Sequence, residues 1–306
     1  MRVFVTGASG HVASAVIPEL VAAGHTVTGL ARSERSAAAV RSLGADVRRG
    51  DLDDLDGLRA AVRGTDGVIH LAFKHEEMRS GDLASAAEAD LRAIEAMAAA
   101  LKGTDKPFVG TAGTLGLILA GVQGQLTEQD TWRAGPRIEA ENHVIGLAEH
   151  GVRSSVVRLP PTVHSNGRYG FVCGLVAIAR ASGVSGYVGE GDNRWPAADT
   201  RDVGRLYRLA LESAPAGSRL HAIAEEGIPV RDTATVIGRR LGVPVASIPS
   251  EQVESHFGYL SGFIGLDNPT SSRFTRDRLG WTPTRPGLLA DLDEGLARES
   301  AAPSAR

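Results

Sequence analysis

The segment Val3-Phe4-Val5-Thr6-Gly7-Ala8-Ser9-Gly10-His11-Val12-Ala13 joins an apolar, β-branched run to a helix through a glycine-rich turn. Residues 2–6 are predicted to form a buried strand. In the turn, Gly7 allows a tight reversal, Gly10 lets a pyrophosphate approach the backbone, and Ala13 lets the helix pack on the strand. The helix start offers free N–H groups to phosphate. The segment therefore predicts a dinucleotide cradle formed by Gly7, Ser9, Gly10, His11 and Val12.

Strand-like and helix-like segments alternate through the first half of the chain. After residues 2–6, strands are predicted at residues 25–31, 46–49, 67–71, 107–110 and 154–159, with helices between them, including a long alanine-rich one at 83–101 and another at 136–150. Because parallel strands need helical crossovers, this pattern predicts an α/β fold with a doubly wound parallel sheet, the Rossmann fold.

The second half of the chain differs in composition and in the length of its predicted strands. Residues 160–199 are rich in glycine, proline and polar turn formers, and short strands alternate with helices after them. We expect a Rossmann NADP(H)-binding core at residues 1–160 and mostly a smaller C-terminal substrate lobe at 161–299, with some chain returning to the core. Residues 300–306 are expected to form a flexible tail.

The composition narrows the class of partner. The 306 residues carry a net charge of −3 with scattered lysines and arginines, which argues against nucleic acid and anionic membranes and leaves a small-molecule substrate. No apolar run is long enough to span a membrane, and no metal-ligand spacing occurs. Cys173 is the single cysteine, so no intramolecular disulfide can form and a reducing cytoplasm is expected.

The spacing T-G-x-x-G-x-x-A from Thr6 to Ala13 resembles the atypical and extended short-chain dehydrogenase/reductase family, which includes the NAD-dependent epimerase/dehydratase-like proteins and usually ends this motif in glycine. Gly50-Asp51-Leu52, His70-Leu71-Ala72 and the stretch 158–164 are also similar to family segments. The resemblance implies adenine beside the first of these, the nicotinamide ribose beside the second and the nicotinamide beside the third. The further cofactor contacts expected are Asp51, Leu52, Leu71, Ala72, Lys74, Pro160 and Val163. A homodimer through the helices at 83–101 and 136–150 is a common arrangement in extended relatives.

The end of the second predicted strand indicates the cofactor. NAD-specific proteins place an acidic residue there for the ribose 2′-hydroxyl. This chain instead has Arg32 and Ser33. A guanidinium and a hydroxyl suit a 2′-phosphate, so the predicted cofactor is NADP(H).

The catalytic pattern of the family is absent. No Tyr-x-x-x-Lys occurs, and in its register Arg137 and Glu141 replace the tyrosine and lysine. These two residues are one helical turn apart, so a simple ion pair between them is the alternative to a catalytic role. Thr111 and Thr114 are the hydroxyls expected near the nicotinamide.

Another residue must then supply a proton. The candidates at the expected mouth of the cleft are Lys74, His75, His164 and Tyr169. His164 is the first choice because imidazole titrates near neutrality, and its alternative is a structural histidine bonded to a loop carbonyl.

We expect an NADPH-dependent reductase that transfers hydride to a small organic carbonyl, imine or enone. General acid catalysis is typically worth 10²–10⁴-fold, and imines and enones depend on it less than ketones do. Two alternatives stay open at this point. One is a non-catalytic NADP(H)-binding redox sensor, and the other is a cyclase or isomerase on the same fold.

Overall fold

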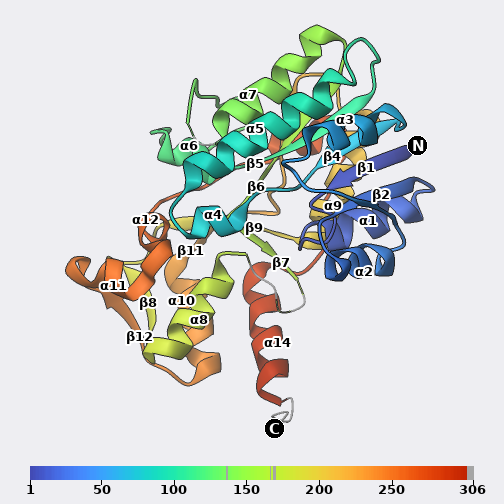
Figure 1. Cartoon of the computed structure of the whole chain (residues 1–306). Coiled ribbons are helices and arrows are strands. Elements are labelled where there is room, and N and C mark those ends of the chain that lie inside the picture. The colour runs from blue at the N-terminus through green and yellow to red at the C-terminus, as the bar shows by residue number, and fades with distance from the viewer. Residues whose placement is uncertain (136, 166, 168–169, 302–306) are drawn as a thin grey trace.

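A seven-stranded parallel sheet forms the centre of the protein (Figure 1). The computed structural model describes residues 1–135, 137–165, 167 and 170–301. The strand order is β10-β6-β5-β4-β1-β2-β3, which confirms the doubly wound Rossmann fold. The strands are β1 (Arg2–Thr6), β2 (Thr26–Ala31), β3 (Asp46–Arg49), β4 (Gly67–His70), β5 (Pro107–Gly113), β6 (Arg153–Leu159) and β10 (Ser218–His221).

Helices cover both faces of this sheet, and alternating side chains on each strand pack against them (Figure 1). On β1, Val3 and Val5 pack toward one set of helices, while Phe4 packs toward the other. The first set is α1 (Ala13–Ala22), α2 (Glu34–Ser42) and α9 (Thr200–Ser213), and the second is α3 (Leu55–Arg63), α5 (Leu83–Ala99) and α7 (Ile138–Gly146). Helices α5 and α7 pack side by side. The homodimer expected through this pair of helices stays a prediction.

A smaller lobe with its own hydrophobic core lies at the carboxyl end of the sheet (Figure 1). Its strands are β7 (Thr162–His164), β9 (Arg194–Asp199) and β11 (Glu225–Pro229) in one sheet, and β8 (Ser185–Val188) with β12 (Val245–Ile248) in another. Its helices are α8 (Val172–Ser182), α10 (Val230–Leu241), α11 (Val253–Phe257), α12 (Ser261–Ile264) and α14 (Leu288–Ala301). Between these segments the chain returns to the large sheet to form α9 and β10.

Short elements complete the fold. They are α4 (His75–Arg79), α6 (Leu115–Leu119), α13 (Arg273–Leu279) and 3-10 turns at Leu147–His150, Ser250–Gln252 and Gly258–Leu260. Within the described residues, no helix combines the length and apolar character needed to cross a membrane.

Two elements differ from the sequence prediction near the site. Strand β5 continues three residues past Gly110 because it stays paired with β6 as far as Gly113 and Leu159. The helix predicted at 136–150 begins at Ile138, after a left-handed Arg137, and tightens into a 3-10 turn after Gly146. Both differences depend on neighbouring strands and loops that a local pattern does not report.

Candidate active site

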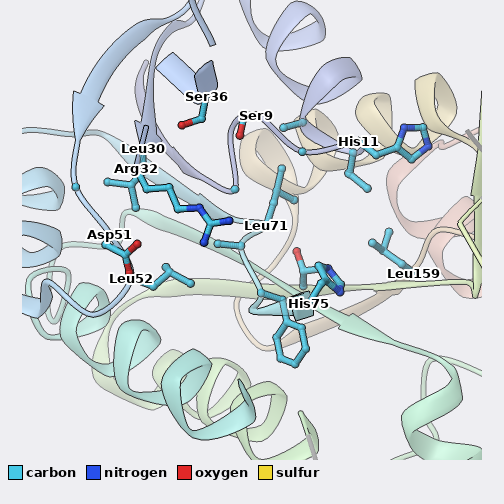
Figure 2. Close-up of a pocket in the computed structure, with 18 of the residues that line it drawn as sticks. Ser9, His11, Leu30, Arg32, Ser36, Asp51, Leu52, Leu71, His75 and Leu159 are labelled. Carbon is cyan, nitrogen blue, oxygen red and sulfur yellow. The ribbon is translucent and has the colours of Figure 1, made fainter. Parts of the chain in front are cut away.

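A cavity of about 420 Å³ lies at the carboxyl ends of β1, β2, β4 and β5, and we call it the cofactor cleft (Figure 2). In Figure 2, Arg32 and Asp51 lie at one end of it and His75 and Leu159 at the other. Twelve residues that the sequence predicted as cofactor or catalytic residues line this cleft: Gly7, Ser9, Gly10, His11, Val12, Arg32, Asp51, Leu52, Leu71, Ala72, His75 and Thr111.

The glycine turn fits a dinucleotide because its backbone has no room for side chains. Gly7 has φ +65°, and a Cβ at this position would lie 2.7 Å from the backbone nitrogen of Ala72. Gly10 donates its N–H to the Gly7 carbonyl at 2.9 Å. The first turn of α1 follows, and Val12, its N-cap residue, makes no side-chain cap. Backbone N–H groups at this wall are therefore available for a pyrophosphate.

A buried chain of hydrogen bonds holds the glycine turn against β4. The Thr6 hydroxyl lies 2.7 Å from Nδ1 of His70, and the N–H of Ala72 donates to Thr6 Oγ1 at 3.3 Å. On its other side, Nε2 of His70 lies 3.0 Å from Oδ1 of the buried Asp90 on α5. These buried contacts tie the glycine turn to β4 and α5.

The end of the cleft where adenosine is predicted to bind contains a cation. The Arg32 side chain extends into the cleft in Figure 2, and Ser36 and Leu52 line the same cavity. Its Nη2 lies 3.7 Å from Oε1 of Glu76, and both side chains are mostly exposed, so this ion pair is weak. Ser33, predicted to contact the cofactor, does not line the cleft, and its hydroxyl caps α2 by accepting the N–H of Ser36 at 3.1 Å. Ser36 takes its place at the cleft wall.

A second cavity of about 660 Å³, which we call the substrate pocket, adjoins the cofactor cleft. The two cavities share His11, Val12, His75, Arg137 and Leu159. Pro160 and Val163, predicted to contact the cofactor, line this second cavity. Its remaining walls are mainly apolar, and they come from α6 and its flanks, α8, and the segment around Tyr259 and Phe263. Among the lining residues that the structure describes, those with polar side chains are His11, His75, Arg137, Cys173 and Tyr259.

Arg137 stands where the two cavities meet. Its guanidinium carbon lies 4.1 Å from the centroid of the Phe73 ring, and its Nη2 donates to the Thr111 carbonyl at 3.0 Å. The edge of the His75 ring packs on the same Phe73, with ring centroids 5.3 Å apart. Arg137 has φ +67°, which is rare outside glycine, and its Nε is buried without an acceptor. A strained cation therefore sits at the register position of the family tyrosine.

Glu141, at the register position of the family lysine, does not pair with Arg137. It accepts hydrogen bonds from the fully buried Arg158 and from Arg219, with Nε to carboxylate distances of 3.0 and 2.8 Å. Burial alone would raise the pKa of Glu141, but the two guanidinium groups outweigh that effect and hold it below its usual range. The ion pair between Arg137 and Glu141 that we had considered from the sequence is wrong, because both partners of Glu141 come from β6 and β10.

Thr111 on β5 and Thr114 just after it have their hydroxyls engaged within the fold. Thr111 lines the cofactor cleft, but its Oγ1 donates to the His70 carbonyl at 2.7 Å and lies 2.7 Å from the Tyr207 hydroxyl. Burial raises the pKa of that tyrosine, so Tyr207 is a poor source of the missing proton. Thr114 is fully buried, accepts from Asn268 Nδ2 at 2.8 Å, and lines neither cavity.

The remaining acid candidates lie in different places. His164 is fully buried outside both cavities, and its Nδ1 lies 3.0 Å from Oδ2 of Asp291 on α14, so its partner is a carboxylate and not a loop carbonyl. Lys74 also lines neither cavity and pairs with Asp53 at 2.8 Å, which raises its pKa. Tyr169 lies outside the described residues. Of the three candidates that the structure describes, His75 is the one placed at the junction of the cavities.

Sequence reasoning missed two residues that shape the site, Ser36 and Phe73. Ser36 stands three positions after Ser33, the spacing of a helix capping pair, so this signal was available. Phe73 directly follows the Leu71-Ala72 segment. Its position between Arg137 and His75 depends on a contact between the loop after β4 and the residue before α7, which no local pattern reports.

Known proteins resemble this chain at three levels. A family described as NAD(P)H-binding matches residues 7–100. Uncharacterized proteins of Schizosaccharomyces pombe and Saccharomyces cerevisiae are each 45% identical to it, over 292 and 294 residues, and each alignment covers 95% of this chain and 98% of the relative. The structure of UDP-glucose 4-epimerase from Thermotoga maritima with UDP-glucose aligns with a TM-score of 0.78 at 16% identity, over 99% of this chain and 100% of the epimerase. That last likeness is one of fold.

Proposed function

Because this chain belongs to the extended short-chain dehydrogenase/reductase family with its NAD(P)H-binding Rossmann fold, we propose that it is an NADPH-dependent reductase of apolar ketones or conjugated enones. Bound NADPH would supply a hydride to the substrate carbon, whose double-bond electrons move toward oxygen, and a proton then completes the reduction. The observation that carries the proposal is Arg137, a cation at the junction of the cofactor cleft and an apolar pocket.

The sign of that charge selects among the substrates expected from the sequence. Reduction of a ketone or enone develops negative charge on oxygen, which a guanidinium stabilises in a site of low dielectric. An iminium ion is already positive, and Arg137 would repel it. The charge therefore favours carbonyl and enone substrates over imines.

Arg137 stabilises charge but is a poor proton donor, because its guanidinium stays protonated at any ordinary pH. We assign the proton to His75, whose ring shares the Phe73 contact with Arg137. Histidine is the side chain that most often acts as a general acid.

The adenosine end supports NADPH over NADH. Arg32 lines the cleft where a 2′-phosphate would lie, and Ser36 is beside it at the start of α2. Breaking the weak ion pair between Arg32 and Glu76 costs about 0–1 kcal/mol, so a phosphate can displace the Glu76 carboxylate from Arg32.

The substrate pocket supports a small apolar substrate over a sugar nucleotide like that of the epimerase structure. A nucleotide diphosphate needs several cationic or N–H donors. Among the described lining residues, the side chains that can carry positive charge are Arg137, His11 and His75. Nε2 of His11 is already engaged by the Val163 carbonyl at 3.1 Å and by Thr200.

Steady-state oxidation of NADPH with a panel of apolar ketones, enones and imines tests the proposal. We expect turnover of ketones or enones and a loss of 10²–10⁴-fold in kcat for His75→Gln. His150→Gln, at an exposed histidine, is the matched control. Saturable NADPH binding without turnover of any compound would support the redox sensor instead, and product without NADPH consumption would support the isomerase.

A further inference from the structure

Arg137 has no carboxylate partner among the described residues, although it stands in a largely apolar setting. The ion pairs of the site join Arg158 and Arg219 to Glu141 and Lys74 to Asp53, and none reaches Arg137. Its Nε is buried without an acceptor. Such a donor costs about 1–3 kcal/mol when left unsatisfied, so the protein tolerates an incompletely paired cation at the junction of the two cavities.

The backbone at Arg137 adds a second cost at the same residue. A left-handed conformation at a non-glycine residue costs roughly 1–2 kcal/mol, and here it places the side chain over Phe73. A guanidinium has five N–H donors. One is used by the Thr111 carbonyl, which leaves four around a fork that stacking on Phe73 holds in plane.

Two oxygens side by side match that fork better than one. The oxygens of a carboxylate, or a ketone oxygen with a neighbouring carboxylate oxygen, accept parallel hydrogen bonds from a guanidinium. Ala134 and Gly135 line the same wall just before α7, so the N-terminus of that helix adds potential of the same sign.

The rest of the pocket determines the chemical character of the part of the ligand that lies away from Arg137. Leu83, Leu115, Phe171 and Phe263 form its apolar walls. Leu119 and Tyr259 also line it and are about half exposed, at 53% and 48%, so the pocket reaches the surface. A volume of about 660 Å³ is typical of sites for small organic ligands.

We infer that the substrate is a 2-oxo or 3-oxo carboxylic acid with an apolar chain, and that Arg137 binds its carboxylate together with the oxygen of the carbonyl being reduced. This inference rests on the proposed function. The reduction is the one given above, so the ketone becomes a hydroxyl and the acid leaves as a hydroxy acid.

A matched set of substrates tests the activity. For 2-oxodecanoate and 3-oxodecanoate we expect kcat/KM about 10- to 100-fold above their methyl esters and above 2-decanone, the range of one charge-assisted pair. Arg137→Gln should remove that preference, and Arg137→Lys should keep part of it because it keeps the charge without the fork. Arg133→Gln, at an exposed arginine nearby, should leave it intact.

Binding without turnover gives an independent readout. Calorimetry on the NADP⁺-loaded protein should show decanoate binding about 10- to 100-fold more tightly than decanol, with the difference lost in Arg137→Gln. The inference would be overturned if the protein reduced the esters and 2-decanone as well as the acids, or bound decanoate no better than decanol. Either result would leave the proposed reductase activity intact. A decanoate preference without NADPH oxidation would overturn the proposed function and leave the carboxylate site.

Discussion

Glu141 on α7 accepts the Nε–H of Arg158 on β6 at 3.0 Å, and both side chains are buried. The position where the family carries a lysine beside the cofactor thus holds the helix onto the sheet. Arg219 from β10 binds the same carboxylate, so three elements meet at one charge.

Loss of the Glu141 charge should lower the stability of the fold more than it lowers the rate of the reaction. Glu141→Gln leaves two guanidinium groups without a full counterion, and breaking a buried pair costs about 3–5 kcal/mol. Urea unfolding should show a drop of that size, whereas Glu139→Gln, at an exposed position on the same helix, should change stability little. A stable Glu141→Gln with strongly impaired turnover would instead place Glu141 in the reaction.

The strain at Arg137 predicts a difference in stability between two inactive variants at this position. Because φ is +67°, Arg137→Gly should be about 1 kcal/mol more stable than Arg137→Ala, and both should lose most turnover. Asp105 has φ +56° and provides the control. Asp105→Gly should be more stable than Asp105→Ala by a similar amount, and both variants should keep their activity. Equal melting temperatures for the two Arg137 variants would show that the backbone there is not strained.

Gly7→Ala should abolish cofactor binding. Its Cβ would lie 2.7 Å from the Ala72 nitrogen in a left-handed conformation, so the turn must move away from the phosphates. Titration with NADP⁺ should give no saturable signal. Gly64→Ala is the matched control, because Gly64 has negative φ and no other group lies within 4 Å of the position that its Cβ would take. Unchanged affinity in Gly7→Ala would remove the glycine turn from the site.

Arg32→Ala should weaken NADP⁺ by about 10- to 100-fold and NAD⁺ hardly at all, because only the former carries the phosphate that Arg32 would bind. The two dissociation constants measured in parallel give the answer. Arg35→Ala, an exposed neighbour in the first turn of α2, should leave both unchanged. If Arg32→Ala weakens both cofactors equally, Arg32 contacts a part that they share.

Acid should destabilise the fold through His221. Burial, together with the Arg158 guanidinium beside it, lowers the pKa of His221 to about 4, whereas the unfolded histidine has its usual value near 6.5. Between these values the unfolded chain binds a proton that the folded chain does not, so stability falls as the pH drops from about 6.5 to 4. Melting temperatures over that range should fall less steeply, from a lower starting stability, in His221→Gln, while His150→Gln should follow the parent protein.

The sequence by itself determined the sheet, the glycine turn and the cation at the adenosine end. These follow from local patterns, because strand alternation, positive φ at Gly7 and the residue that follows β2 are set within a few positions along the chain. The absence of the tyrosine and lysine was also readable from spacing alone.

Only the tertiary structure decided what the remaining candidates do. His164 was expected at the mouth of the cleft, but α14 folds back from the end of the chain and buries it against Asp291. Arg137 and Glu141 are four residues apart, yet one meets Phe73 and the other meets Arg158. Side-chain partners supplied by distant segments settle burial and charge, and a linear pattern does not contain them.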